Sequence, residues 1–437
     1  MNNPIVRKLP FFYGWVVIAT AFVTMAIAVN ARTSFSLLFP AILDEFGWNR
    51  GMTAGAFSVG FVASAIIIPV VGMMMDRWSP RVVIPIGATM VIAGLIGAMY
   101  VSTPLGIYAT LGVLVVSGSI AMSYITHSMF LPNWFVKRRG LAIGIAFSGV
   151  GVGSILLLPW IGRIIDGAGW RQACFTMAVA VAVIVPLNFF LQRKRPEDMG
   201  LEPDGEGRQG ARSGTPSPDP VVDRAWAETN WTPRLAVRTG RFWWIAIAYF
   251  TGMFVWYSVL VHQTAYLIEV GFDSGTAAMA LGLVGLFGIA GQIGIGALSD
   301  RIGREWAWTI GLGGFAASYG ALILLADGPS LTWLYVMIMT QGCIGFGLAS
   351  IFGAITAEIF AGPRYATIFG MTSLAGNLGA GAGPWITGYI YDSAGSYVPA
   401  FWLCIAMAVV SSIAVWLAAP RKVRLVAGRA KRLKVDS

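Results

Sequence analysis

Two short segments of this chain read almost alike and lie about half of its 437 residues apart. The first reads Gly-Met-Met-Met-Asp-Arg at 72–77, and the second reads Gly-Ala-Leu-Ser-Asp-Arg at 296–301. Each segment follows a long apolar stretch rich in small residues, and each precedes another such stretch. A charged turn that recurs between apolar spans is typical of membrane proteins built from an internal repeat. The repeat therefore predicts a chain of two related halves.

The composition predicts an integral membrane protein. Hydrophobic residues make up 57% of the chain and charged residues only 11%, whereas soluble domains average about 25% charged residues. A helix needs roughly 20 apolar residues to cross the hydrocarbon core. The sequence offers twelve candidate spans, at about 13–39, 51–73, 82–101, 105–131, 140–162, 171–191, 242–267, 275–298, 306–326, 331–357, 365–390 and 398–419. We therefore expect an all-α membrane fold of two pseudosymmetric six-helix bundles, and not a β-barrel.

The positions of the basic residues predict the orientation of the chain. If the N-terminus is cytoplasmic, almost all of the 30 Lys and Arg fall in cytoplasmic segments. Both termini are therefore expected on the cytoplasmic side of the inner membrane, where anionic lipid headgroups would balance the net charge of +10. A nucleic-acid partner is not expected, because the basic residues are dispersed over many turns and form no single stripe.

The composition changes between the sixth and seventh spans. Residues 196–240 carry six prolines and many charges, which is typical of a linker. We predict an N-terminal bundle at 1–195, a cytoplasmic linker at 196–240, a C-terminal bundle at 241–420 and a basic cytoplasmic tail at 421–437. Within the linker, the stretch Asp223–Val237 could form a short surface helix.

The sequence gives no sign of catalytic or cofactor chemistry. It contains no Walker-type phosphate loop, no paired metal ligands and no nucleophile next to a base. The three cysteines, Cys174, Cys343 and Cys404, fall in predicted spans and suit packing better than disulfides or metal ligands. We therefore expect neither an enzyme, nor a cofactor, nor ATP-driven transport within this chain.

The two charged turns are expected to act as cytoplasmic latches. Their glycines allow close helix approach, their aspartates can cap a helix N-terminus, and their arginines can pair across the turn. Glu358, near the inner end of the tenth span, and Arg364 are interpreted as a further gate pair. The alternative is that these charges only fix topology. The expected gating residues are Asp76, Arg77, Arg81, Asp300, Arg301, Arg304, Glu358 and Arg364.

The twelve-span plan, the paired turns and the linker resemble the major facilitator superfamily over nearly the whole chain. Residues 134–149 read Trp-Phe-Val-Lys-Arg-Arg-Gly-Leu-Ala-x-Gly-x-Ala-x-Ser-Gly, which resembles the signature of the monocarboxylate transporters. Phe-Tyr-Gly-Trp at 12–15 is similar to the shorter N-terminal signature of that family. The oxalate–formate antiporter branch shares much of this pattern. The resemblance implies transport of small organic anions, often carboxylates.

Arg32 is the only basic residue well inside a predicted span. Its burial in lipid would cost at least ~2.5 kcal/mol, so we expect it to face a water-filled cavity and bind a carboxylate. The alternative is an arginine that extends to the outer headgroups. By alignment with the family that the chain resembles, Arg32 lies one position from a functional lysine, whose own place is taken by Thr33.

Both histidines lie in predicted spans, His127 in the fourth and His262 in the seventh. A histidine can donate a hydrogen bond to a carboxylate and can carry a proton near neutral pH. The interval from Trp15 to Thr33 equals that from Trp244 to His262, so pseudosymmetry would bring His262 towards the central cavity. The alternative for each histidine is a polar bond between helices.

Six further side chains complete the expected substrate site. They are Tyr124, Trp256, Tyr257, Gln292, Ser373 and Asn377. Tyr124 aligns with a cavity aromatic of the oxalate branch, although aromatic residues in spans often face lipid or only pack. Gln292 and Ser373 take the places where that branch carries Arg and Lys, so the dianion chemistry of that branch is in doubt. Asn377 lies one helical turn beyond Ser373 and is a further donor.

The sequence thus predicts an inner-membrane secondary active transporter that works by alternating access on small organic anions, most simply monocarboxylates. None of the 20 Asp and Glu lies in the middle of a predicted span, so proton symport would depend on a histidine, the substrate or a carboxylate at a span end. Exchange and uniport stay open, and a monomeric functional unit is expected. The alternatives are an organic-anion exchanger, an efflux carrier for amphipathic compounds, and a carrier-like membrane sensor.

Overall fold

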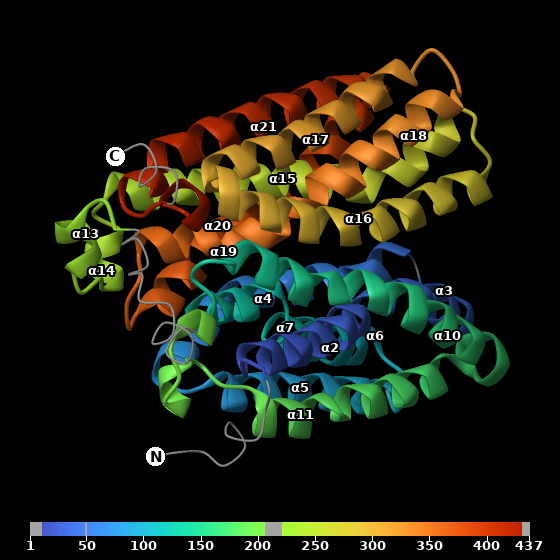
Figure 1. Cartoon of the computed structure of the whole chain (residues 1–437). Helices are drawn as coiled ribbons and strands as arrows, with labels where there is room; N and C mark the ends of the chain where they lie inside the picture. Colours follow the sequence, from blue (N-terminus) through green and yellow to red (C-terminus); the bar gives the residue numbers. More distant parts are fainter. Residues whose placement is uncertain (1–10, 49, 206–220, 431–437) are drawn as a thin grey trace. The chain divides into compact units, whose positions relative to one another are not determined.

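The fold consists of two compact helical units in a computed structural model that describes residues 11–48, 50–205 and 221–430. Unit 1 comprises Met1–Phe135 and Ala146–Gly214, and unit 2 comprises Val136–Ile145 and Thr215–Ser437. In each unit the long helices run alongside one another (Figure 1). Part of the expected linker, residues 206–220, and the end of the expected basic tail, residues 431–437, lie outside the described residues.

Unit 1 contains the first half of the chain except for the start of helix α10 (Arg139–Ala182), which belongs to unit 2. Its helices are α2 (Gly14–Thr33), α3 (Phe35–Phe46), α4 (Arg50–Arg77), α5 (Pro80–Ala98), α6 (Pro104–Ile107), the π-helix η1 (Tyr108–Val116), α7 (Ser117–Ile120), α8 (Tyr124–Ser128), α9 (Leu131–Trp134), most of α10 (Arg139–Ala182), α11 (Ile184–Leu191), η2 (Glu197–Met199) and η3 (Pro203–Gly205). Here α11 packs against α2 and α5, while η1 packs against α4 and α5.

Unit 2 repeats this pattern of packing. Its helices are α13 (Arg224–Glu228), α14 (Pro233–Ala236), α15 (Gly240–Glu269), α16 (Ser274–Ile302), α17 (Arg304–Leu324), α18 (Leu331–Met339), the π-helix η4 (Thr340–Ile344), η5 (Gly345–Gly347), α19 (Leu348–Ile359), α20 (Tyr365–Ala394), α21 (Val398–Ala418) and η6 (Pro420–Lys422). Here α21 packs against α15 and α17, while η4 packs against α16 and α17. Each unit therefore has the same pattern of contacts within itself, in addition to its copy of the repeated turn.

Each expected span corresponds to a helix or a run of short helices. In the described part of the chain, ten stretches are long and apolar enough to cross a membrane. One of them, Arg139–Leu191, covers the expected fifth and sixth spans. It is interrupted at Gly169, whose φ of 84° lies in the left-handed region that glycine adopts readily. The expected eleventh span is α20, which is not among the ten because its sequence is rich in Gly, Ser, Thr and Asn.

In unit 1, glycines let α10 approach α2 at backbone distance. A Cβ atom on Gly149 would meet the carbonyl oxygen of Phe22, and one on Gly153 would meet that of Ala26. Asn30 of α2 strengthens this contact, because its Nδ2 donates a hydrogen bond to the Val150 carbonyl of α10 at 3.1 Å. Small residues therefore allow these two helices to pack closely.

In unit 2, the corresponding contact joins α20 to α15. A Cβ atom on Gly379 would meet the carbonyl oxygen of Phe250, and one on Gly383 would meet that of Phe254. Both contacts recur at a spacing of four residues, which places the two glycines on one face of α20. The same device thus fixes one helix pair in each unit.

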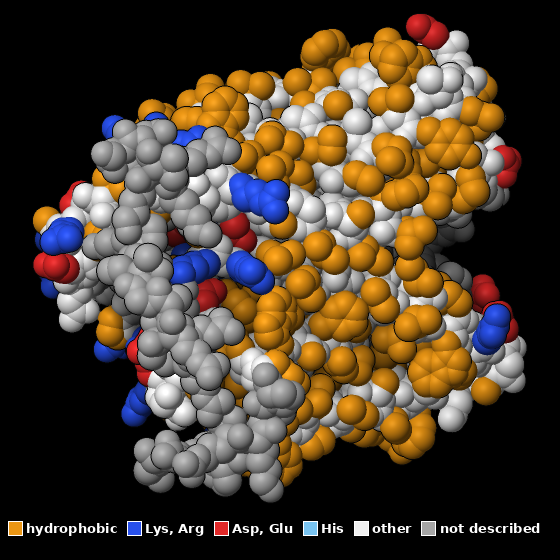
Figure 2. All heavy atoms as spheres, in the orientation of Figure 1, with side chains coloured by type: hydrophobic (Ala, Val, Ile, Leu, Met, Phe, Trp, Pro, Cys, Tyr) orange, Lys and Arg blue, Asp and Glu red, His pale blue; other side chains and the backbone are white. Residues whose placement is uncertain are grey.

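The described end of the linker forms two short helices and pairs with the C-terminal segment. Asp223 caps α13 by accepting a hydrogen bond from the Trp226 N–H, and Thr232 caps α14. The single helix considered over Asp223–Val237 is therefore broken, with Pro233 starting the second piece. The Val222 N–H donates to the Val423 carbonyl at 2.9 Å. In the face shown in Figure 2, hydrophobic side chains cover the flanks of the long helices.

Candidate functional site

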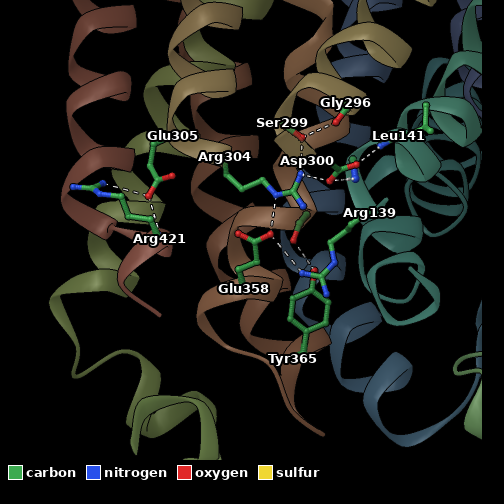
Figure 3. A network of polar contacts seen from close by, with 12 residues as sticks. Arg139, Leu141, Gly296, Ser299, Asp300, Arg304, Glu305, Glu358, Tyr365 and Arg421 are labelled. Carbon is green, nitrogen blue, oxygen red and sulfur yellow. Dashed lines mark hydrogen bonds and ion pairs between the residues drawn. The ribbon is translucent and has the colours of Figure 1, made fainter. Parts of the chain in front are cut away.

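A buried ionic cluster lies inside unit 2, at the turn between α16 and α17 (Figure 3). We call it the Arg304 cluster. Its members are Arg139, Ser299, Asp300, Arg304 and Glu358, together with the backbone N–H groups of Gly140 and Leu141. The helices α10, α16, α17 and α19 supply these residues.

Arg304 is the centre of the cluster and is only 1% exposed. Its Nη1 lies 2.7 Å from Asp300 Oδ1 and donates to Ser299 Oγ at 2.5 Å. Its Nε lies 2.8 Å from Glu358 Oε1. A buried guanidinium needs such partners, because each unpaired charge inside a protein costs several kcal/mol. Arg304 therefore links the end of α16 to the end of α19.

Asp300 uses its carboxylate to cap the start of α10. Its Oδ1 accepts a hydrogen bond from the Gly140 N–H at 2.9 Å, and its Oδ2 accepts one from the Leu141 N–H at 3.0 Å. These N–H groups belong to the first turn of α10, which carries the positive end of the helix dipole. A Cβ atom on Gly140 would meet the carbonyl oxygen of Gly296, so only glycine permits this approach.

Glu358 has partners other than the one expected from the sequence. It pairs with Arg304 and lies 3.7 Å from Arg139 Nη1. Arg364 is exposed at the N-terminal end of α20, so the expected Glu358–Arg364 pair is wrong. The physical reason is burial: Glu358 is 5% exposed and needs charged partners that are buried with it.

The first charged turn differs from the second. Lys194 Nζ donates to the backbone carbonyl of Asp76 at 2.7 Å, and Arg81 Nε donates to the carbonyl of Phe189 at 2.9 Å. Arg77 is exposed, as is Arg301 in the second turn. The two turns are thus similar in sequence, but only the second has an arginine, Arg304, that is buried among carboxylates.

Three of the expected substrate residues belong to unit 1. Arg32 is half-buried in the last turn of α2, with its guanidinium carbon 5.5 Å from the centre of the Phe61 ring. In the described part of the chain it makes no ion pair. Tyr124 lies edge-on to Phe147, with ring centres 4.8 Å apart. His127 is fully buried, and its Nδ1 lies 3.1 Å from the Ser123 carbonyl.

Within the described residues, His127 Nε2 has no hydrogen-bond partner. His262, in unit 2, has both ring nitrogens engaged. Its Nε2 lies 2.9 Å from the Pro384 carbonyl, and its Nδ1 lies 3.3 Å from the Tyr397 hydroxyl. His262 therefore joins α15 to α20 and to the residue that precedes α21. This is the interhelical bond that the sequence offered as the alternative to substrate binding.

The other expected substrate residues also belong to unit 2. Gln292 and Ser373 are buried, and within the described residues Gln292 Oε1 and Ser373 Oγ have no hydrogen-bond partner. Trp256 stacks on a phenylalanine of η5, with ring centres 4.7 Å apart. Tyr257 and Asn377 are half-buried. Gln292, Ser373, Tyr257 and Asn377 thus give this unit four neutral polar side chains that are buried or half-buried.

Arg139 and Ser299 were not predicted as members of the Arg304 cluster. Arg139 stood out only as the last of three basic residues before Gly140, and basic residues after a span usually fix topology. Ser299 is one small residue among many in the repeated turn. Nothing in the spacing indicated that the two would share a buried carboxylate network.

No metal centre emerges from residues 11–48, 50–205 and 221–430. They contain no group of three or more His, Cys, Asp or Glu side chains that could hold a metal ion. The three cysteines are free thiols.

Comparison with known proteins identifies the family. The profile described as Major Facilitator Superfamily matches residues 20–354. Monocarboxylate transporter 13 of Bos taurus is 24% identical over 397 residues, which cover 89% of this chain and 85% of that protein. Monocarboxylate transporter 11 of Mus musculus is 24% identical over 425 residues, covering 94% of this chain and 88% of that protein.

A comparison of structures supports the same fold. The structure of the proton:xylose symporter XylE bound to 6-bromo-6-deoxy-D-glucose matches with a TM-score of 0.73 at 13% identity. The match covers 96% of this chain and 99% of that chain. The predicted all-α membrane fold is confirmed, and so is the expectation of a transporter and not an enzyme. This chain belongs to the major facilitator superfamily and is a multi-pass secondary transporter distantly related to the monocarboxylate transporters.

Proposed function

We propose that this transporter carries small organic anions, most simply monocarboxylates, by alternating access. The observation that carries the proposal is Arg32, a half-buried arginine at the end of a membrane-spanning helix, without an ion pair in the described part of the chain. An ionisable side chain inside a membrane span costs free energy, and such a residue usually serves a substrate or ion pathway. The distant monocarboxylate-transporter relatives, which align with most of the chain, favour a carboxylate as its partner.

The other expected substrate residues fit a single negative charge. Gln292 and Ser373 are neutral, and each offers a buried polar atom that needs a partner. A monoanion bound by Arg32 keeps charge balance, whereas a dianion would leave one negative charge uncompensated. We therefore propose Arg32 as the anion-binding group, with His127, Tyr124, Gln292, Ser373, Asn377, Trp256, Tyr257 and His262 as the remaining candidates for the binding site.

Uptake by proteoliposomes tests this function. Purified protein is reconstituted and supplied with labelled short monocarboxylates, a dicarboxylate, a sugar and an amphipathic cation, each with and without an inward proton gradient. We expect saturable uptake of monocarboxylates and exchange with unlabelled monocarboxylate inside. Stimulation by the gradient would identify proton symport, and its absence would identify exchange or uniport. Uptake of the sugar or the cation alone would refute the proposed substrate class.

We also propose a latch role for the Arg304 cluster. Asp300 holds the first turn of α10 through two backbone N–H groups, and Arg304 fixes Asp300 in place. Release of this turn would change the environment of α10 without touching the substrate. We propose only a weaker contribution to the latch from the remaining charged residues. They are the exposed Arg301 and Arg364, and Asp76, Arg77 and Arg81 of the first turn.

We propose an inner-membrane location with both termini cytoplasmic, because the basic residues favour that orientation. Single cysteines at Arg234 and Asp327 test it by labelling with an impermeant maleimide in intact cells. Asp327→Cys should react from outside, and Arg234→Cys only after permeabilisation. The wild type gives the background, since Cys174 and Cys404 are buried and Cys343 is half-buried. The opposite pattern would reverse the orientation.

A further inference from the structure

A shallow hollow lies at the surface of unit 2, next to the turn between α16 and α17. It has a volume of about 270 Å³, and its lining residues are Arg301, Ile302, Trp306 and Arg429. This is below the roughly 300–1,000 Å³ of sites that enclose drug-sized ligands. The size therefore suits a compact headgroup better than a large organic molecule.

Two unpaired cations face this hollow. Within the described residues, the side chains of Arg301 and Arg429 make no ion pair and no hydrogen bond. Glu305, the acidic residue in the first turn of α17, is buried and already accepts hydrogen bonds from the Arg421 backbone N–H at 2.9 Å and from Arg421 Nη1 at 3.3 Å. Its charge is thus largely balanced by Arg421, which leaves an excess of positive charge at the hollow.

The start of α17 adds to this positive potential. The helix has 21 residues, and Gly303 at its N-terminal end provides no side chain to cap the free N–H groups. A Cβ atom on Gly303 would lie 3.5 Å from Glu305 Oε2 and 3.6 Å from Arg429 Nε, so both side chains lie beside this helix end. A helix N-terminus and guanidinium groups together form a favourable place for a phosphate.

The position of the hollow along the helices matches the depth of lipid headgroups. One membrane-spanning stretch ends at Ile302 and the next begins at Arg304. Trp306 is 46% exposed and packs edge-on against Trp416, with ring centres 5.1 Å apart. The guanidinium of Arg421 lies 4.6 Å from the centre of a Trp416 ring. Such Trp and Arg side chains are typical of the membrane–water interface.

We propose that this hollow binds the phosphate of an anionic phospholipid headgroup, through Arg301, Arg429 and the first turn of α17. The C-terminal segment supplies one of the two arginines, and Gly428 packs directly on the backbone of Arg301. A bound headgroup therefore bridges the C-terminal segment and the α16–α17 turn, and stabilises their contact. Free phosphate offers the same chemistry, so the test separates the two sources.

The test measures lipid binding by the purified full-length protein in detergent. Dioctanoyl-phosphatidylglycerol, dioctanoyl-phosphatidylcholine and inorganic phosphate are titrated separately, with bound lipid counted by native mass spectrometry and the thermal midpoint followed in parallel. The variants are Arg301→Gln, Arg429→Gln and the double variant. Arg238→Gln, which removes one exposed charge elsewhere in unit 2, is the matched control.

We expect wild type and Arg238→Gln to bind phosphatidylglycerol more tightly than phosphatidylcholine and to gain thermal stability from it. Two interfacial arginines contribute about 1 kcal/mol each, so the double variant should bind at least about tenfold more weakly. Inorganic phosphate should raise the midpoint little; if it matches the lipid, the site takes soluble phosphate and the lipid assignment is overturned. Equal phosphatidylglycerol binding by the wild type and a folded double variant would overturn the site itself.

Discussion

At the scale of single residues, the protein separates two kinds of arginine. Arg304 is 1% exposed and held by two carboxylates, whereas Arg32 is half-buried and has no ion pair within the described residues. The charge of the first kind is already compensated, which fits the structural and latch role proposed for it. The second kind is available to an anion, because its charge is not.

Replacement of Arg304 by methionine should destabilise the protein strongly. Asp300 and Glu358 would stay buried without their shared cation, and breaking a buried pair in this way costs about 3–5 kcal/mol. The free energy of unfolding in detergent measures the effect. Arg234→Gln, an exposed change on α14, should alter it by no more than about 0.5 kcal/mol.

A neutral double variant separates charge imbalance from lost packing. Arg304→Met combined with Glu358→Met removes one charge of each sign and leaves Asp300 with Arg139 in the cluster. This variant should be more stable than the sum of the two single changes predicts, because no buried charge is left in excess. Strict additivity would contradict the charge-balance account of the Arg304 cluster.

A second ion pair, at an exposed site in unit 1, should make a small pH-dependent contribution. Glu45 in α3 accepts a hydrogen bond from Arg171 Nη1 at 2.5 Å, and this bond lowers the pKa of Glu45 below its ordinary value of 4.5. A folded pKa below the unfolded one stabilises the protein above the unfolded pKa, and the effect is lost as pH falls through the folded pKa. Both side chains are more than a third exposed, so solvent limits the contribution to about 1 kcal/mol at most.

The comparison of wild type with Glu45→Gln checks this contribution. Thermal midpoints in detergent should favour wild type near neutral pH, and the difference should shrink as pH falls below about 4. A difference that grows under acid would have the wrong sign for an ionised Glu45 paired with Arg171.

At the scale of helices, glycine decides which pairs pack closely. Gly379 on α20 meets the backbone of α15, whereas a Cβ atom on Gly381, two residues away, would meet nothing within 4 Å. Gly153 and Gly162 form a similar contrast on α10. A methyl group therefore has opposite effects at neighbouring positions of the same helix.

Gly379→Ala and Gly153→Ala should each destabilise the protein by about 1–3 kcal/mol, since the added methyl group collides with backbone that must shift. Gly381→Ala and Gly162→Ala are the matched controls and should be neutral or stabilising by up to about 1 kcal/mol, because alanine favours the helix. Denaturation in detergent gives both numbers. Equal effects within each matched pair would show that the close approach is not energetically important.

The sequence predicted the helices well and the polar contacts poorly, for a physical reason. Apolar runs of membrane length identify a span almost by themselves, and each expected span corresponds to a helix or a run of helices. The π-helical segments η1 and η4 were not predicted, because an apolar run does not reveal a local change in hydrogen bonding. Glu358 was assigned to Arg364, a neighbour in sequence, whereas its partners Arg304 and Arg139 come from distant helices.

At the scale of the whole molecule, the repeat in the sequence matches a repeat in packing. In each unit a glycine-bearing helix packs on the first long helix, α10 on α2 and α20 on α15. The two units differ in their charged residues, since the Arg304 cluster is in unit 2 and Arg32 is in unit 1. Duplication therefore accounts for the scaffold, while the residues that we propose for substrate binding and gating are ones that the halves do not share.

The most direct test of the proposed function is the concentration dependence of monocarboxylate uptake by wild type and Arg32→Gln in matched proteoliposomes. A charge-assisted hydrogen bond contributes roughly 1.5–3 kcal/mol, or about ten- to hundredfold in affinity. Arg32→Gln should therefore raise the half-saturating concentration by at least about tenfold, and Arg32→Lys should fall between the two. Arg163→Gln, which removes an exposed arginine of the same unit, should behave like wild type. Unchanged half-saturation in a folded, correctly inserted Arg32→Gln variant would contradict the account and place anion binding elsewhere.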